Sequence, residues 1–254
     1  MQVGEMQAKP PKILLWGDIG TGKTALALTL GEGALCYDLD DGVMTGATLK
    51  DKWYDDRRKV EVRQFIEKEP HKKAIAFNQV KQSIISLANE FNAKTAKWTA
   101  VILDSISTLA DMAVAQIMSN SGTPNAAPQI QHWGLAFSEI QQVLAMLRIL
   151  PVPVVMIGHE QTKTIGSGLD ADTKLELAIN GKNMPSKIMR YCDEIWYMKV
   201  KAAAGGKVTY NILTNANPTV PARSRGQIPN NTDTACGMWE LIRLSGYTKP
   251  EVKK

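Results

Sequence analysis

The sequence is poor in cysteine and has no long run of apolar residues. Its three cysteines, Cys36, Cys192 and Cys236, are scattered along 254 residues. An odd number at such spacing fits neither a disulfide framework nor a zinc site, so we expect buried structural thiols. The longest apolar stretch, residues 143–158, is interrupted by Arg148 and two prolines. It falls short of the roughly 18 residues that a membrane span needs.

A secretory signal is also missing at the N-terminus. The first residues, MQVGEMQAKPPK, contain no apolar core of the kind that signal peptides carry. We therefore expect a cytoplasmic protein without a membrane partner. The net charge is +5, which is compatible with a polyanionic partner but does not by itself indicate one. The densest basic segment, 50–73, also carries six acids. This mixture favours a solvated surface insertion, with a nucleic-acid patch as the alternative.

What the sequence does contain is an alternation of apolar runs and helical patterns. This alternation predicts an α/β fold with a mainly parallel sheet flanked by helices. The expected strands are 12–16, 33–40, 99–105 and 152–159, and the expected helices are 23–30, 74–91, 107–119 and 134–150. In the helix at 74–91 we expect Ile75, Val80, Ile84, Leu87, Ala88 and Phe91 to share one face.

The pattern changes after residue 159. Residues 160–183 are polar and glycine-rich, which predicts a loop. Two strands, 193–201 and 207–215, follow with Gly205-Gly206 between them, and this predicts an antiparallel extension near the C-terminus. Residues 233–246 are expected to form a closing helix. We thus expect an N-terminal tail (1–11), a single domain (12–246) and a basic tail (247–254).

The stretch GDIGTGKT at 17–24 satisfies the pattern G-x-x-x-x-G-K-[ST] between an expected strand and an expected helix. Its backbone N–H groups can surround an anion at a helix N-terminus. Lys23 is expected to reach the β- and γ-phosphates of ATP, and Thr24 to coordinate Mg²⁺. The expected nucleotide-binding residues are Gly17, Asp18, Ile19, Gly20, Thr21, Gly22, Lys23, Thr24 and Ala25.

Three more polar residues follow apolar strands. Asp104, in VILDS, is expected to complete the metal site, with helix capping as the alternative. Asp40, in YDLDDG, is our candidate for orienting the attacking water, on a second strand that we expect beside the first. Glutamate is the commoner residue in that role, and a turn at Asp41-Gly42 is the alternative. His159 is expected to close the fourth strand and to sense the γ-phosphate; a structural histidine is the alternative.

In their order along the chain, GDIGTGKT, YDLDDG, VILDS and MIGHEQTK resemble the motifs of RecA-core ATPases. With HWG at 132–134, CDEIWYMKV and PARSRGQIP, the chain resembles more closely the phage single-strand annealing proteins of the fourth Sak group, over roughly residues 12–245. The resemblance implies an RecA-like core and Mg²⁺-dependent ATP hydrolysis stimulated by single-stranded DNA, in recombination or annealing. For a phage protein, the location would be the host cytoplasm.

The same resemblance implies two DNA-binding loops after the third and fourth strands, here about 119–133 and 160–183. The second loop would bind phosphates through Lys163, Lys174 and Lys182. In the first, Trp133 is either a stacking residue or a core anchor. The resemblance further implies a homo-oligomeric ring or filament, and a single-stranded DNA-binding protein as a further partner.

In such an assembly, Arg223 and Arg225 would reach the γ-phosphate held by a neighbouring subunit, although plain surface arginines are the alternative. Only eleven residues precede the first expected strand, so we expect annealing or a helper role rather than strand exchange by this chain alone.

Other P-loop classes lack their hallmarks here. We find no N/T-K-x-D motif of GTPases and no LSGGQ-like signature of ABC ATPases. The segment 190–232 reads as strands and turns rather than the helical bundle of an AAA+ remodeller, and the 160–183 segment has no arginine of a kinase lid. A different class of function stays open, namely a nucleotide-gated interaction module that recruits replication or recombination proteins with little ATP turnover.

Overall fold

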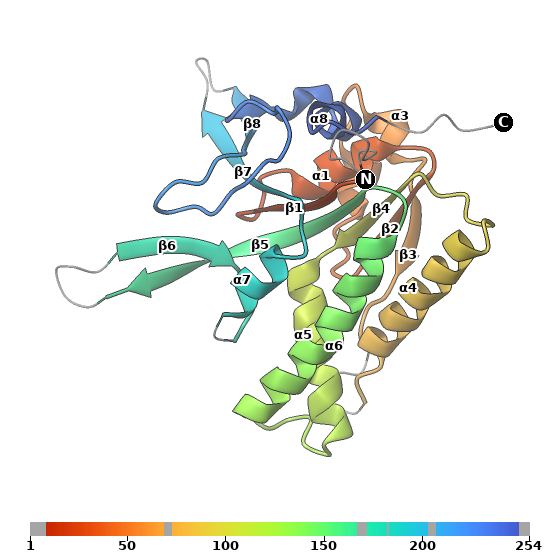
Figure 1. Cartoon of the computed structure of the whole chain (residues 1–254), viewed down its shortest axis with the longest axis vertical. Helices are drawn as coiled ribbons and strands as arrows, with labels where there is room; N and C mark the ends of the chain where they lie inside the picture. Colours follow the sequence, from red (N-terminus) through yellow and green to blue (C-terminus); the bar gives the residue numbers. More distant parts are fainter. Residues whose placement is uncertain (1–8, 69–72, 167–171, 182, 203–206, 249–254) are drawn as a thin grey trace, which may run out of the picture.

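A computed structural model describes residues 9–68, 73–166, 172–181, 183–202 and 207–248. Lys182 and the Gly205-Gly206 turn lie outside these ranges. Figure 1 shows one twisted sheet with helices on both faces. The sheet contains β1 (Lys12–Gly17), β2 (Ala34–Asp38), β3 (Glu61–Gln64), β4 (Ala100–Asp104), β5 (Val154–Ile165), β7 (Glu194–Ala202), β8 (Val208–Leu213) and β9 (Thr232–Asp233). β6 (Asp172–Leu177) pairs with the outer part of β5.

The strand order is β3-β2-β4-β5-β1-β7-β8-β9. Every pairing from β3 to β7 is parallel, whereas β7, β8 and β9 pair antiparallel. The expected fold class is therefore confirmed, including the antiparallel extension. The expectation that the second strand lies beside the first is wrong, because β4 and β5 separate them. The chain passes from β2 to the edge strand β3 and then returns through α4 to the other side of β2, so sequence order does not follow spatial order.

Helices cover the two faces of the sheet unequally (Figure 1). The larger layer contains α4 (Ala76–Asn92), α5 (Ile106–Asn120), α6 (Ile130–Ile149) and α7 (Met184–Met189), and the smaller contains α1 (Lys23–Ala27) and α8 (Met238–Leu244). Short helices η2 (Leu28–Leu30), α2 (Met44–Thr48), α3 (Tyr54–Arg57) and η5 (Thr234–Cys236) complete the described structure.

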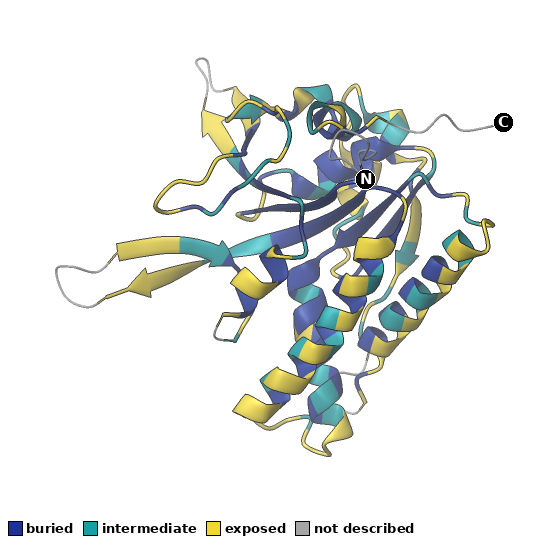
Figure 2. Cartoon of the chain, in the orientation of Figure 1, coloured by how far each residue is buried: buried dark blue, intermediate teal, exposed yellow. Residues whose placement is uncertain are grey.

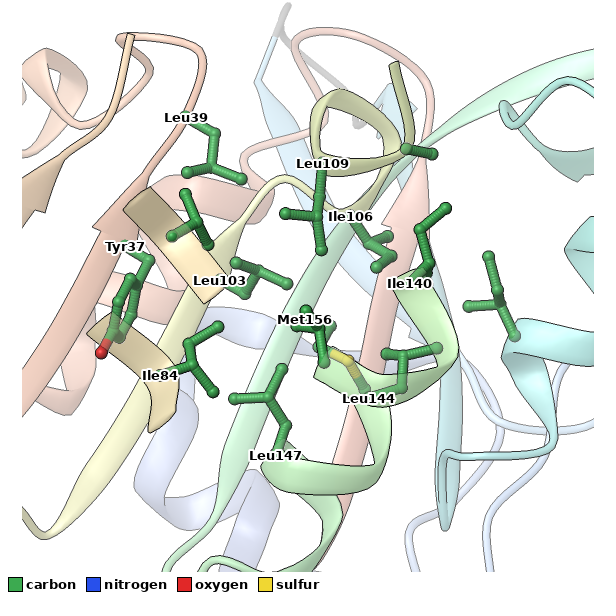
Figure 3. Close-up of a cluster of buried hydrophobic side chains, with 14 of the residues drawn as sticks. Tyr37, Leu39, Ile84, Leu103, Ile106, Leu109, Ile140, Leu144, Leu147 and Met156 are labelled. Carbon is green, nitrogen blue, oxygen red and sulfur yellow. The ribbon is translucent and has the colours of Figure 1, made fainter. Parts of the chain in front are cut away.

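Each central strand contributes side chains to two cores because successive residues point to opposite faces. In β1, Leu14 and Trp16 join the core under α4–α7, whereas Ile13 and Leu15 join the core under α1 and α8. Figure 3 shows the larger core, in which Leu103 and Met156 of the sheet lie among helical side chains. Figure 2 shows the result: β1, β2 and β4 are buried along their length, as is the first part of β5. This two-sided burial holds the carboxyl ends of β1 and β4 in register with the middle of β5.

The helices begin close to where the sequence predicts them. In α4, Val80, Ile84, Leu87 and Ala88 are buried as expected, but Ile75 precedes the helix and is 42% exposed. Helix α6 begins at Ile130, four residues earlier than expected, because Gln129 and His132 form a capping box. The closing helix is split by Gly237 into η5 and α8.

Two segments expected to be irregular form strands. The charged segment 50–73 contributes α3 and β3, which extends the sheet by pairing with β2. The expected loop 160–183 is largely an antiparallel hairpin, because β5 continues to Ile165 and pairs with β6. Figure 1 shows this hairpin protruding from the body of the protein. Both of its faces are largely exposed, so the period-2 alternation that marks a half-buried strand is absent.

Cys36 and Cys192 are buried as free thiols, whereas Cys236 is only half-buried. Within the described ranges, no helix combines the length and the hydropathy that crossing a membrane requires.

Candidate nucleotide and metal site

The loop at 17–22 connects the buried end of β1 to the start of α1. Gly17 lies at a φ of 152°, and a Cβ there would collide with the carbonyl oxygen of Met198 on β7. Gly22, directly before α1, has a left-handed conformation with φ 83°. The two glycines therefore let the chain turn sharply and keep the backbone N–H groups at the helix N-terminus accessible to an anion.

Lys23 is buried inside this loop. Its Nζ donates to the carbonyl oxygens of Gly17 (3.0 Å) and Asp18 (2.7 Å). Burial lowers the pKa of Lys23, and the nearby carboxylates of Asp104 and Asp18 oppose that shift. The ammonium group is thus held on loop carbonyls, from which it can transfer to phosphate oxygens without a change of the backbone.

Thr24 and Asp104 meet at the start of α1. The Thr24 hydroxyl donates to Asp104 Oδ2 at 2.6 Å. Asp104 is 2% exposed at the end of β4. Burial raises the pKa of Asp104 to about 6, the Thr24 hydrogen bond opposes the shift, and the charges of Asp40 and Asp38 add to it. Asp104 does not cap helix α5. The capping residue is Ser105, whose side chain accepts a hydrogen bond from the Thr108 N–H.

These oxygens fit Mg²⁺. Mg²⁺ prefers hard oxygen ligands and usually takes one or two protein side chains, with water and phosphate oxygens completing the octahedron. Thr24 and Asp104 would be those two side chains, and the crowded carboxylates that raise the Asp104 pKa favour a divalent cation. Within the described residues, no three His, Cys, Asp or Glu side chains converge as in an all-protein metal centre.

Asp40 reaches this site from the loop after β2. Its Oδ2 lies 3.2 Å from the Thr108 hydroxyl and 3.3 Å from His159 Nε2. Burial raises the Asp40 pKa, but hydrogen bonds from His159, Ser105 and Thr108 outweigh this and leave the pKa below its usual value. The loop is compact because Asp41 has a φ of 60° and the Gly42 N–H donates to Asp38.

The sequence predicts that His159 closes the fourth strand. This is wrong, because His159 lies in the middle of β5, which continues to Ile165. It pairs in register with Gly17 of β1, and its N–H donates to the Ser107 hydroxyl at 3.1 Å. Its Nε2 lies near Asp40, while its Nδ1 is buried and has no partner among the described residues. From His159 onward, β5 leaves the core and enters the protruding hairpin.

A cavity of about 660 Å³ begins at the loop and extends along α1, away from Asp104. Besides residues of the loop and α1, it is lined by Trp53, Met198, Tyr210 and Asp233. The Tyr210 ring lies 3.4 Å from the position a Cβ on Gly22 would take. The cavity is larger than a phosphate chain requires, so its apolar end can accept the base of a nucleotide. Sequence reasoning missed these residues because they come from four separate segments without a shared motif.

The remaining predicted residues lie elsewhere. Arg223 forms a β-bridge with Ile195, and its guanidinium donates to the Cys192 carbonyl oxygen. Arg225 is 60% exposed and pairs with Asp193 at 2.9 Å. Both lie at the amino end of β7, whereas the phosphate loop follows the carboxyl end of β1. The two arginines are therefore not at the nucleotide site of their own chain.

On the hairpin, Lys163 and Lys174 are cross-strand neighbours, and Lys163 pairs with Glu176 at 3.0 Å. Lys182 lies outside the described residues. Trp133 lies in α6 rather than in a loop, partly buried against the larger core.

Comparison with known proteins gives one family match. Residues 9–226 match the family described as an AAA domain. No curated protein matches the sequence. The chain is also similar to many solved structures, two of which, both at low identity, are as follows. The flagellar accessory protein FlaH from Methanocaldococcus jannaschii has 10% identity and a TM-score of 0.42, covering 81% of this chain and 77% of its own. A type III secretion system ATPase from pathogenic bacteria has 12% identity and a TM-score of 0.48, covering 75% of this chain and 51% of its own.

Proposed function

Because this chain belongs to the AAA-domain family of P-loop ATPases, we propose that it hydrolyses ATP with Mg²⁺ and couples this hydrolysis to single-stranded DNA in recombination or annealing. The observation that carries the hydrolysis is the convergence of Lys23, Thr24, Asp104, Asp40 and His159. These side chains come from four segments and are linked by the hydrogen bonds from Thr24 to Asp104 and between Asp40 and His159. A loop that only binds a nucleotide, without hydrolysing it, would not need the hydrogen bond between Asp40 and His159.

Each residue has a distinct task in this proposal. Lys23 exchanges its two carbonyl partners for oxygens of the β- and γ-phosphates. Thr24 and Asp104 hold Mg²⁺, which when bound offsets charge on the transferring phosphoryl group. Asp40 orients the attacking water, and Thr108 and His159 fix its carboxylate. His159 senses whether the γ-phosphate is present.

The coupling to DNA is supported by the continuity of β5. The same strand carries His159 at the nucleotide site and, four residues later, Lys163 on the protruding hairpin. A change in the position of His159 would therefore be transmitted along an uninterrupted backbone to a surface that carries lysines. A basic net charge of +5 favours a polyanionic partner.

Assembly of several copies is part of the same proposal. Arg225 is exposed and lies far from the phosphate loop of its own chain. In a head-to-tail ring or filament it would lie near the γ-phosphate of a neighbour, where an arginine stabilises charge in the transition state. Disruption of its pairing with Asp193 would then be part of subunit docking.

The alternative, a nucleotide-gated interaction module, is favoured by one observation. Three donors occupy the Asp40 carboxylate and lower its pKa, which makes it a weaker base. Such a site would bind ATP, move the hairpin and recruit a protein such as a single-stranded DNA-binding protein, with little turnover.

Steady-state hydrolysis of ATP with Mg²⁺, measured with and without single-stranded DNA, separates the two functions. Lys23→Ala serves as the blank because it removes the phosphate-binding ammonium group. We expect a rate that rises with DNA and disappears in the variant. Tight ATP binding with a negligible rate under both conditions would support the interaction module instead.

A further inference from the structure

A second pocket, of about 520 Å³, lies between α6 and α7. It is lined by Phe137, Gln141, Arg148, Lys187, Arg190 and Tyr191. Its volume is within the range of small-ligand sites, about 300–1,000 Å³. None of these residues belongs to the nucleotide site or to the segments that the sequence predicts to bind DNA.

The charged residues that line this pocket are all positive. Arg148, Lys187 and Arg190 are exposed, and within the described ranges none of the three has an ion pair or a side-chain hydrogen bond. No carboxylate is among the lining residues. Three unpaired cations around one hollow therefore mark a place that attracts anions.

Two aromatic rings line the pocket together with these cations. The Lys187 ammonium lies 4.8 Å from the centre of the Phe137 ring. The Tyr191 hydroxyl accepts from Gln141 Nε2 at 3.1 Å, and the ring is partly buried against the larger core. Tyr191 is thereby held in one orientation. Cations together with positioned rings are the combination that binds the phosphates and bases of a single strand.

The pocket lies at the opposite end of the sheet from the phosphate loop. Arg148 is in the last turn of α6, just before β5, and Arg190 follows α7, just before β7. From Val154 at the start of β5 to His159 at the nucleotide site, five strand steps cover about 17 Å. A ligand here would be separate from bound ATP.

We propose that the α6–α7 pocket binds single-stranded nucleic acid, with the three cations on its phosphates and the rings against its bases. The inference rests on the part of the proposed function that concerns single-stranded DNA, and it deepens that part by placing the DNA strand on a surface other than the β5–β6 hairpin. An acidic peptide could use the cations but would leave the rings without a planar partner, so a nucleic acid fits both features.

The test is the binding of a fluorescein-labelled oligo-dT, followed by anisotropy across a salt series. The double variant Arg148→Gln/Arg190→Gln neutralises two pocket cations, and Lys201→Gln/Lys207→Gln removes the same charge from exposed residues of β7 and of the segment directly before β8. We expect the pocket variant to bind about tenfold more weakly than the control. The slope of log K against log salt should fall by about 1.4, because each single-strand phosphate contact contributes about 0.7. ATP hydrolysis without DNA should be the same in both variants.

A second variant tests the rings. Phe137→Leu should reduce the preference for oligo-dT over an abasic oligonucleotide of equal length, because leucine fills the space without a stacking surface. An unchanged preference would overturn the role assigned to the rings.

Three other results would overturn the proposal. If the pocket variant binds like the control while Lys163→Gln/Lys174→Gln loses binding, the strand lies on the hairpin, and the proposed function stands without this pocket. If the wild-type protein hydrolyses ATP but binds no oligonucleotide at low salt, both the pocket and the DNA coupling fail. If polyglutamate or phosphatidylserine vesicles compete as well as the oligonucleotide, the pocket belongs to another anionic partner.

Discussion

Replacing Asp104 with asparagine should make the protein more stable and inactive at once. Asp104 is almost fully buried at the end of β4, beside Asp40 and Asp38, and accepts a hydrogen bond from Thr24. Asparagine has nearly the same shape, and its Oδ1 can still accept from Thr24. The substitution therefore removes a buried negative charge while it preserves packing and the hydrogen bond.

The size of the effect follows from the pKa of Asp104. Its folded value is about 6 against an ordinary 3.8, so the ionised carboxylate is disfavoured in the folded protein by about 3 kcal/mol at 1.36 kcal/mol per pH unit. A raised folded pKa means that the stabilisation associated with proton binding is fully present below pH 3.8 and is lost as pH rises through 6. Without metal, Asp104→Asn should be up to about 3 kcal/mol more stable at pH 7.5, and this advantage should vanish towards pH 4.

Urea unfolding at pH 7.5 and pH 4, in EDTA, measures this difference. Asp55→Asn, an exposed residue of α3, controls for the loss of one carboxylate and should change stability by less than about 0.5 kcal/mol. Addition of Mg²⁺ and ATP should stabilise the wild-type protein more than Asp104→Asn, which should also lose hydrolysis. The reasoning is refuted if Asp104→Asn is less stable than wild type at pH 7.5 without metal, or if the difference does not depend on pH.

Three further substitutions test other parts of the structure. Gly17→Ala should destabilise the fold by about 2 kcal/mol or more and weaken nucleotide binding, because its Cβ would meet the β7 backbone. Gly20→Ala would meet no atom within 4 Å and adds only the cost of a left-handed φ of 76°, about 1 kcal/mol, so it should destabilise the fold less. Equal losses in chemical unfolding would contradict this view. Because we expect the Tyr210 ring to contact the base, Tyr210→Ser should raise the Kd for ATP several-fold and leave the Kd for inorganic phosphate nearly unchanged. Isothermal titration calorimetry measures both Kd values, and an unchanged Kd for ATP would contradict this contact. Lys12 is buried on the carbonyl oxygens of Leu150 and Val152, and burial lowers its pKa to about 8. Because the folded pKa lies below the ordinary value of 10.5, the free energy of unfolding of wild type relative to Lys12→Met should rise by up to about 3 kcal/mol between pH 8 and 10.5, as measured by urea unfolding. A stability difference that does not depend on pH would argue against a lowered Lys12 pKa.

The sequence predicts the fold best where the signal is local and burial is complete. The runs at β1, β4 and the first half of β5 are continuously apolar because both faces are covered, and they were placed within a residue or two. The hairpin of β5 and β6 was missed because both of its faces are largely exposed and no apolar pattern marks them. The segment 50–73 was missed as part of the sheet because β3 is a short, charged edge strand.

The sequence alone predicted a phosphate site at residues 17–24, because the loop is contiguous and its glycines, lysine and threonine act through local backbone geometry. It also indicated which strand ends carry polar side chains. Only the tertiary structure decided how they meet, since β4 and β5 separate β2 from β1 and bring Asp40 against His159 rather than beside the loop. The apolar end of the nucleotide cavity and the cationic α6–α7 pocket are likewise tertiary, because packing brings together residues that no spacing in the chain connects.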